Sequence, residues 1–286
     1  MTQDGVEVTP SEQAERVARA KQVVLTYHAD LDRALADGKI DEIDRALSNH
    51  TIGDDYRWRG MHPFGELRGG AAVTDTFYRP LIHAFTPMQR RPDVFLAGHN
   101  DVEHGDETTA EQIPAGGHDA DDHSVWVCQM GHILGLFDHP WLDIPPTRKM
   151  CFLRYAEFHR VLPEGESGEP TGGSIAESAL FIDVVSVMAQ ADVYPLPPQT
   201  GADHVQTGPL THNGILLEPQ NPDQSARTMA IVNRMIGDLT ESNRIAARTG
   251  DNRVPADVLR RSWHDDMIWS GPAGIGATYT IDRYQQ

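Results

Sequence analysis

Three long segments of β-type sequence lie close together before residue 185, and they constrain the fold more than any other feature. Each is rich in apolar, aromatic and β-branched residues, and the segments run over 124–137, 149–161 and 174–183. Helical periodicity comes earlier in the chain, over 10–36, 39–47 and 70–85. Because helices come first and neighbouring strands follow, the sequence predicts an α+β fold with helices packed on one face of a mostly antiparallel sheet.

The sequence also predicts shorter elements of this fold. We predict strands near 56–58 and 93–98, and a bend or interruption of the third helix at Pro80. The polar stretches 98–123 and 163–173 are rich in Gly, Pro and acidic residues, as surface loops are.

The charge of the chain limits its partners. Its 286 residues include 24 basic and 42 acidic ones, a net charge of −18, which argues against nucleic acid or an anionic membrane as a partner. No apolar run is long enough to cross a membrane, and the N-terminus lacks the features of a signal peptide. Cys128 and Cys151 lie singly in apolar runs, as free thiols of a reducing compartment do. We therefore expect a cytoplasmic protein.

An internal repeat divides the chain. The segment DDYRWRGMHPFG, 54–65, matches DDMIWSGPAGIG, 265–276, at five positions with an offset of 211, and one of them is the pair Trp58/Trp269. Similar helix starts precede both segments, TPSE at Thr9 and NPDQ at Asn221, with an offset of 212. The alternative is that two unrelated glycine-rich turns resemble each other by chance.

We predict three parts on this basis: a first domain over 1–193, a Pro/Gly-rich linker over 194–220, and the N-terminal part of a second copy over 221–286. The second copy ends before any counterpart of the long strands, so its apolar helix face has no sheet to cover it. We favour a shortened chain as the reason. The alternative is a tail that docks on the first copy or on a neighbouring subunit.

Four short motifs follow one another along the first copy: Gly131, His132 and Gly135; Pro145, Pro146, Thr147 and Lys149; Ile175, Glu177 and Asp183; and Gln190. In this order they resemble the SnoaL-like polyketide cyclases of the nuclear transport factor 2-like superfamily. Arg148, Ser174 and Ala179 depart from the family pattern, and Ala179 stands where the family has tryptophan. The resemblance covers about residues 10–192 and, in part, 222 to the end.

The resemblance implies a cone-shaped half-barrel, in which a curved, mostly antiparallel sheet wraps around helices and leaves a cavity between them. It also implies a homodimer, no cofactor, and an acid/base role for Asp183. The residues themselves allow two interpretations of Asp183. Apolar surroundings would raise the pKa of its carboxyl group toward the range useful for proton transfer. Alternatively, the carboxylate caps a helix over 184–190.

Two histidines are further catalytic candidates. His132 alternates along its strand with Trp126 and Met130, so it faces either the cavity, where it could bind a substrate carbonyl, or the core. His159 shares a strand face with Tyr155 and could reach Asp183 from a neighbouring strand, either as an acid–base pair or as a simple cross-strand ion pair.

The predicted substrate-binding residues are aromatic: Tyr56, Trp58, Trp126, Tyr155 and Phe181. Tyr56 and Trp58 would line the cavity or plug it. The loop sequence HDADDH, 118–123, gathers imidazoles and carboxylates but lacks a fixed ligand spacing, so we expect no metal ion there.

Two functions stay open. The first is a cofactor-independent acid/base enzyme of cyclase or isomerase type, in which Asp183, helped by His132 or His159, moves a proton next to the carbonyl of a small apolar molecule. The second is a non-catalytic module of the same fold that binds a small ligand or serves assembly. The first copy could also be a degenerate one, since fold does not imply reaction.

Overall fold

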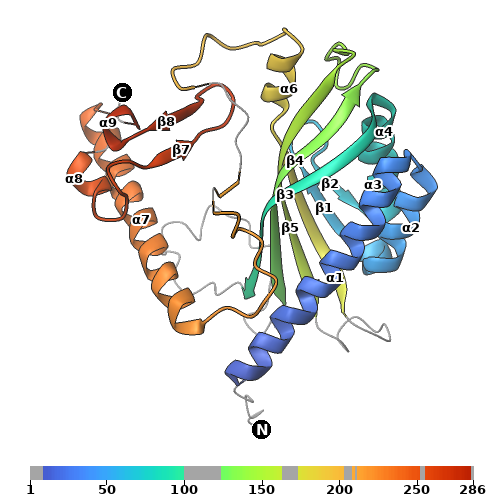
Figure 1. Cartoon of the computed structure of the whole chain (residues 1–286), viewed down its shortest axis with the longest axis horizontal. Coiled ribbons are helices and arrows are strands. Elements are labelled where there is room, and N and C mark those ends of the chain that lie inside the picture. The colour runs from blue at the N-terminus through green and yellow to red at the C-terminus, as the bar shows by residue number, and fades with distance from the viewer. Residues whose placement is uncertain are drawn as a thin grey trace. The chain divides into compact units, whose positions relative to one another are not determined.

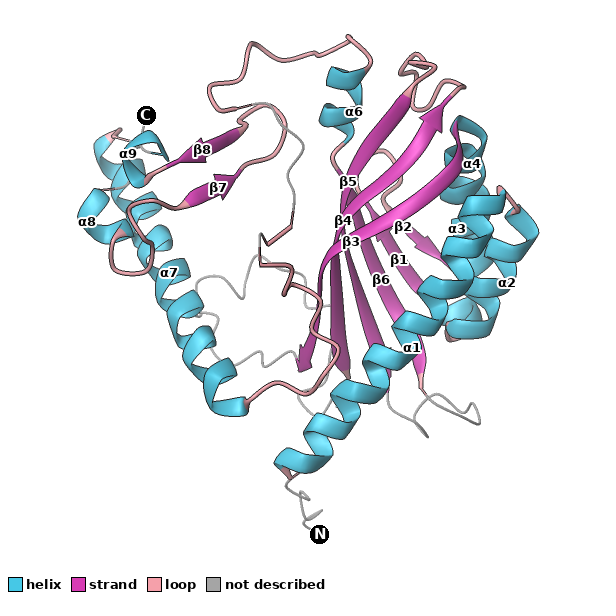
Figure 2. Cartoon of the chain, in the orientation of Figure 1, coloured by secondary structure: helices cyan, strands magenta, loops and turns pink. Residues whose placement is uncertain are grey.

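The computed structural model of the chain is shown in Figures 1 and 2. It describes residues 9–99, 124–162, 173–202, 208–209, 211–251 and 255–284. The chain divides into two compact units. The first comprises Met1–Val193 and Thr207–Pro219, and the second comprises Tyr194–Gln206 and Gln220–Gln286.

The longest helix of the first unit, α1 (Pro10–Asp37), has both of its ends fixed by local sequence. Thr9 and Glu12 form a reciprocal capping box, and the αL residue Gly38 closes the last turn. One face of the helix is apolar and fully buried, with Val24 and Leu31 at its centre. The helix therefore packs against the sheet from Ala20 onward, whereas the side chains of 11–19 are exposed or half-buried.

Shorter helices follow in the order α2 (Ile40–His50), α3 (Gly70–Val73) and α4 (Arg79–Ala84). The predicted third helix is interrupted, but the break is a π-helical turn over Thr74–Tyr78 that precedes Pro80. Pro80 lies directly after this turn, in the first turn of α4, and it lacks the N–H that would make a helical hydrogen bond.

The six strands of the first unit are β1 (Arg57–Gly60), β2 (Glu66–Arg68), β3 (Phe85–His99), β4 (Val125–Phe137), β5 (Met150–Leu162) and β6 (Ser174–Ile182). They form one curved sheet in the order β2-β1-β6-β5-β4-β3 (Figure 2). All neighbours are antiparallel except β1 and β6. The mostly antiparallel α+β fold is confirmed.

Strand β3 is much longer than the strand predicted near 93–98. It starts at Phe85 and contains Pro87 and Pro92. It lies at the edge of the sheet, where a residue without an N–H costs no ladder hydrogen bond. The register with β4 shifts near each proline. Edge position thus explains why a sequence with two prolines is still a strand.

The two faces of the sheet differ sharply. Every second residue of β5 from Cys151 to Val161 is buried, and the residues between them are half-buried. The buried side is the one that α1 covers, as His28 of α1 contacts His159 of β5 (Figure 1). We call it the inner face, and the opposite side the outer face.

Cys128 and Cys151 are both free thiols.

The segment 208–219 of the predicted linker belongs to the first unit. Its Gly214 carbonyl accepts a hydrogen bond from Phe95 of β3, and its Leu216 N–H donates to the Phe95 carbonyl, both at 2.8 Å. Lys21 of α1 donates to the carbonyls of Leu217 and Glu218. These contacts tie the segment to the edge of the sheet and to the long helix.

The second unit contains α7 (Pro222–Thr249), α8 (Ala256–Leu259), a hairpin of β7 (Ile268–Ser270) and β8 (Ala277–Tyr279), and α9 (Ile281–Tyr284). Helix α6 (Val184–Gln190) ends the main part of the first unit. Among the described residues, none of the helices combines the length and the apolar character that a membrane crossing needs.

The elements of the second unit correspond in detail to those of the first. Helices α1 and α7 are both 28 residues long, start with proline and end at an αL glycine. Trp58 pairs with Leu67 in one hairpin, and Trp269 pairs with Thr278 in the other, which is the same register at an offset of 211. These correspondences support the tandem copy, which stays a prediction.

We predict that Gly60→Ala destabilises the first unit by about 1–3 kcal/mol, the usual cost of overpacking. A Cβ at Gly60 would overlap the Cη2 and Cζ3 atoms of Trp58. The Trp58 ring is buried and packs against Phe77. Gly98→Ala is the control, because a Cβ there meets nothing within 4 Å. Urea unfolding of both variants measures the difference, and equal midpoints would contradict the prediction.

Candidate active site

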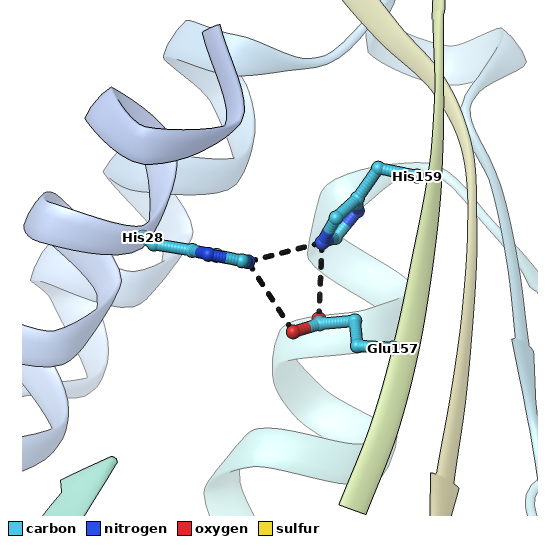
Figure 3. Close-up of side chains that lie close together, drawn as sticks. All are labelled: His28, Glu157 and His159. Carbon is cyan, nitrogen blue, oxygen red and sulfur yellow. Dashed lines mark hydrogen bonds and ion pairs between the residues drawn. The ribbon is translucent and has the colours of Figure 1, made fainter. Parts of the chain in front are cut away.

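A buried cluster of ionisable side chains lies between α1 and β5. His28 points from the helix toward Glu157 and His159 on the strand (Figure 3). The two Nε2 atoms are 3.0 Å apart, His28 Nε2 lies 3.3 Å from Glu157 Oε2, and His159 Nε2 lies 3.5 Å from Glu157 Oε1. Side-chain exposure is 6% for His28, 2% for Glu157 and 0% for His159. We call these three residues the triad.

Local periodicity explains how the triad forms. Successive strand residues point to opposite faces, so Glu157 and His159 both face inward from β5, as predicted for His159 and Tyr155. His28 lies one turn from Val24 and Leu31 on the apolar face of α1. From that face the His28 ring reaches Glu157 and His159.

Arg90 of β3 connects the triad to the protein surface. Its Nη1 donates to Glu157 Oε2 at 2.8 Å, and its Nε lies 2.9 Å from Asp32 Oδ1. The Arg90 side chain is 3% exposed, whereas that of Asp32 is 41% exposed. The Arg90 guanidinium also lies over the ring of Tyr155, 5.6 Å from its centroid. A buried positive charge is thus held between two carboxylates and an aromatic ring.

The ion pair between Arg90 and Glu157 determines the charge state of the triad. Burial alone would raise the pKa of Glu157, but the charge of Arg90, together with His159 and His28, outweighs it and holds that pKa well below its usual value. Burial, aided by the charge of Arg90, lowers the pKa of His28 to about 3. At neutral pH the site therefore contains an ionised Glu157 and a neutral His28.

The contact between His28 Nε2 and His159 Nε2 requires that one of these two nitrogen atoms carries a proton and the other accepts it in a hydrogen bond. His159 Nδ1 lies 2.7 Å from Ser178 Oγ on β6. If Nδ1 donates to that hydroxyl, His159 Nε2 carries a lone pair and accepts from His28 Nε2 at 3.0 Å. One proton on one Nε2 atom satisfies the contact, and two such protons would repel each other. The arrangement is that of a base with its orienting groups.

Three of the aromatic residues predicted to bind substrate are buried: Tyr56, Trp58 and Tyr155. Burial raises the pKa values of Tyr27 and Tyr56, so their hydroxyl groups stay neutral. Trp58 packs against Phe77 at a centroid distance of 4.9 Å, which is core packing.

Asp183 lies elsewhere. It is the N-cap of α6, and its Oδ1 accepts a hydrogen bond from the Ser186 N–H at 3.0 Å. Its own N–H donates to the carbonyl of Arg154, whereas His159 pairs with Ser178, five residues back along β6. At about 3.3 Å per residue, the structure does not bring His159 and Asp183 together. The helix-cap interpretation matches the observed contact.

The outer face carries the remaining candidates. His132 lies there, with its Nδ1 3.3 Å from Asp93 Oδ2. Trp126 and Phe181 lie on the same side of the sheet, and Phe181 is 50% exposed. The structure therefore separates these three from Tyr56, Trp58 and Tyr155 by the thickness of the sheet. The loop 118–123 lies outside the described residues.

Sequence reasoning missed His28, Arg90 and the role of Glu157. One signal was available, because His28 interrupts the apolar face of a helix. Arg90 gave no such signal, since it falls between two prolines in a segment that the sequence does not predict as strand. Only the sheet order places it beside Glu157.

The first unit is thus an α+β domain whose sheet and long helix enclose an ionisable triad. Neither a known family profile nor a curated protein matches the sequence. Solved structures do match the fold. One is described as a SnoaL-like polyketide cyclase from Jannaschia sp. CCS1, with 16% identity, 68% of this chain and 100% of that chain covered, and a TM-score of 0.36.

Two Streptomyces proteins are also similar. AclR from Streptomyces galilaeus, described as a hydroxylase, has 13% identity, 65% and 86% coverage of this chain and that chain, and a TM-score of 0.40. IdmH from Streptomyces antibioticus, described as a polyketide cyclase, has 15% identity, 59% and 97% coverage, and a TM-score of 0.36. The likeness of each of these structures to this chain concerns the fold alone.

We predict that acid destabilises the first unit through the triad. The pKa of His28 is about 3 in the folded chain and 6.5 when unperturbed, so between these values the unfolded chain binds the additional proton. Stability is therefore lost as the pH falls below 6.5, by up to about 1.4 kcal/mol per pH unit for one proton. Glu157, whose pKa is also lowered, adds to the loss below about 4.5.

The measurement is the free energy of unfolding in urea from pH 7.5 to 5. His28→Gln should flatten the slope, and the exposed His83→Gln should leave it unchanged. Parallel slopes for the wild type and His28→Gln would show that His28 is not held neutral by its surroundings.

Proposed function

We propose that the first unit is an acid/base enzyme that moves a proton next to the carbonyl group of a small organic molecule. His159 is the proposed base, and Glu157 and His28 position it. The observation that carries the proposal is the buried triad, with its contacts of 3.0 to 3.5 Å. Groups within such reach of each other are typical of an activated base with an orienting partner.

The reaction follows from the charges. When the hydrogen bond from His28 to His159 opens, the Nε2 lone pair of His159 takes the proton from the carbon next to the carbonyl, and the C–H electron pair becomes that of an enolate. The anion of Glu157 stabilises the imidazolium that forms. The enolate then either takes the proton back at another carbon, which is an isomerisation, or attacks a second carbonyl to close a ring, after which the imidazolium protonates the new alkoxide.

Arg90 keeps the base functional. Its positive charge holds Glu157 ionised, and its contact with the half-exposed Asp32 links the triad to solvent. None of the triad side chains is more than 6% exposed. Substrate therefore reaches His159 only when neighbouring side chains move aside.

The other candidates of the sequence have positions that favour structural roles. Asp183 caps α6, and His132 pairs with Asp93 on the outer face. Their catalytic roles stay predictions, and both residues serve as matched comparisons with His159. Asparagine caps helices as well as aspartate does, so Asp183→Asn leaves the helix start intact.

We expect His159→Gln to lower the rate of α-proton exchange about 10²–10⁴-fold, the usual contribution of a general base. Exchange is followed by ¹H NMR in D₂O with a panel of small cyclic ketones and diketones. His132→Gln and Asp183→Asn should keep the wild-type rate. Loss of exchange in Asp183→Asn with no change in His159→Gln would overturn the proposal in favour of Asp183.

The alternative function is a ligand-binding module. It would be supported if the panel compounds bind, as measured by chemical-shift changes, and the wild type exchanges none of their protons. A homodimer stays an expectation from the family resemblance.

We also propose that the second unit is the start of a second copy. At the offset of 212, the counterpart of His28 is Thr240. The second long helix therefore lacks the triad histidine, which supports the first copy as the one that carries the site.

A further inference from the structure

We propose that His28, Glu157 and His159 form a binding site for one divalent transition-metal ion, with zinc as the reference ion. Two imidazoles and one carboxylate are a common ligand set for catalytic zinc and for non-haem iron. The inference goes beyond the proposed function, because an ion there would occupy the Nε2 lone pair of His159 that proton transfer uses.

The spacing of the donor atoms supports the site. One donor atom from each residue can be chosen so that all lie within 4.8 Å of one another, and all three residues are buried. The closest contacts are 3.0, 3.3 and 3.5 Å. Ligands at about 2.0–2.2 Å from zinc are themselves about 2.8–3.6 Å apart on an octahedron or a tetrahedron. The two contacts of His159, 3.0 Å to His28 Nε2 and 3.5 Å to Glu157 Oε1, already have the separation of ligands around one ion, whereas the 3.3 Å contact of His28 is with Glu157 Oε2.

The surroundings of the donors fit the same role. Ser178 binds the Nδ1 atom of His159 at 2.7 Å, which orients the ring with Nε2 toward Glu157. Metal-bound histidines usually make such a bond through their second nitrogen. Arg90 binds Oε2 of Glu157 and leaves Oε1, the oxygen nearer His159, as the expected ligand atom.

The charge of Arg90 opposes a cation. It is balanced by Glu157 and by Asp32, which both contact the guanidinium group. The site then presents one net negative charge, as a His₂Glu set does in the absence of arginine. A single ion also needs far less space than an organic substrate, which suits side chains that are almost fully buried.

The test uses the full chain after treatment with a chelator, titrated with Co²⁺ and with Zn²⁺. We expect one ion per chain, visible ligand-field absorption with Co²⁺, and displacement of Co²⁺ by Zn²⁺. His28→Gln and His159→Gln should each weaken binding at least tenfold. His83→Gln, an exposed histidine, is the matched control and should bind as the wild type does.

A second variant covers the case that a ligand variant does not fold. Ser178→Ala keeps all three ligands and should weaken binding about 10–100-fold, the usual effect of losing such an orienting group. A variant of the acidic loop, His118→Gln with His123→Gln, tests a competing position. The proposal is overturned if the wild type binds neither ion, or if binding survives in His28→Gln and His159→Gln but is lost in the loop variant.

The metal site and the proposed proton transfer can each be refuted without refuting the other. Ion binding is measured without turnover, and proton exchange is measured in chelator-treated protein. If both hold, Zn²⁺ should abolish proton exchange with the concentration dependence of binding.

Discussion

Glu157 is an ionised carboxylate with almost no contact with water, and the first unit is arranged around that constraint. An unpaired charge in such a place would cost several kcal/mol, so charged and polar partners must converge on it from other elements. Arg90 comes from the edge strand β3 and His28 from the long helix α1. His159 comes from β5, the strand that carries Glu157 itself. Their convergence joins α1, β3 and β5 at one point. Removing Arg90 would leave the buried charge of Glu157 without its cationic partner.

The sheet divides the candidate residues between its two opposite faces. Glu157, His159 and Tyr155 lie inward, and every inward position of β5 is buried. His132, Trp126 and Phe181 lie outward, where Phe181 is half exposed. This division decides which candidate residues can act together. A reaction on the inner face can use the triad and the neutral tyrosines, and it cannot use His132.

The second unit repeats the local geometry of the first but buries much less of it. Ile236 of α7, the counterpart of Val24 at the offset of 212, is 53% exposed, whereas Val24 is fully buried. The helix caps and hairpin registers are alike because they depend on residues close together in sequence. Burial differs because it depends on long strands, and the described part of the second unit contains only a two-stranded sheet.

The sequence by itself determined the long strands, α1 with its capping box, and the alternation that places His159 and Tyr155 on one face. These features depend on short-range periodicity and on caps that lie within a few residues of each other. It also allowed Asp183 as a helix cap, which the structure bears out in its contact with Ser186. Only the tertiary structure decided which face is inner and brought together His28, Arg90 and Glu157. Those residues are up to 129 positions apart, between His28 and Glu157. Contacts over such separations depend on strand order and register, which no local pattern encodes.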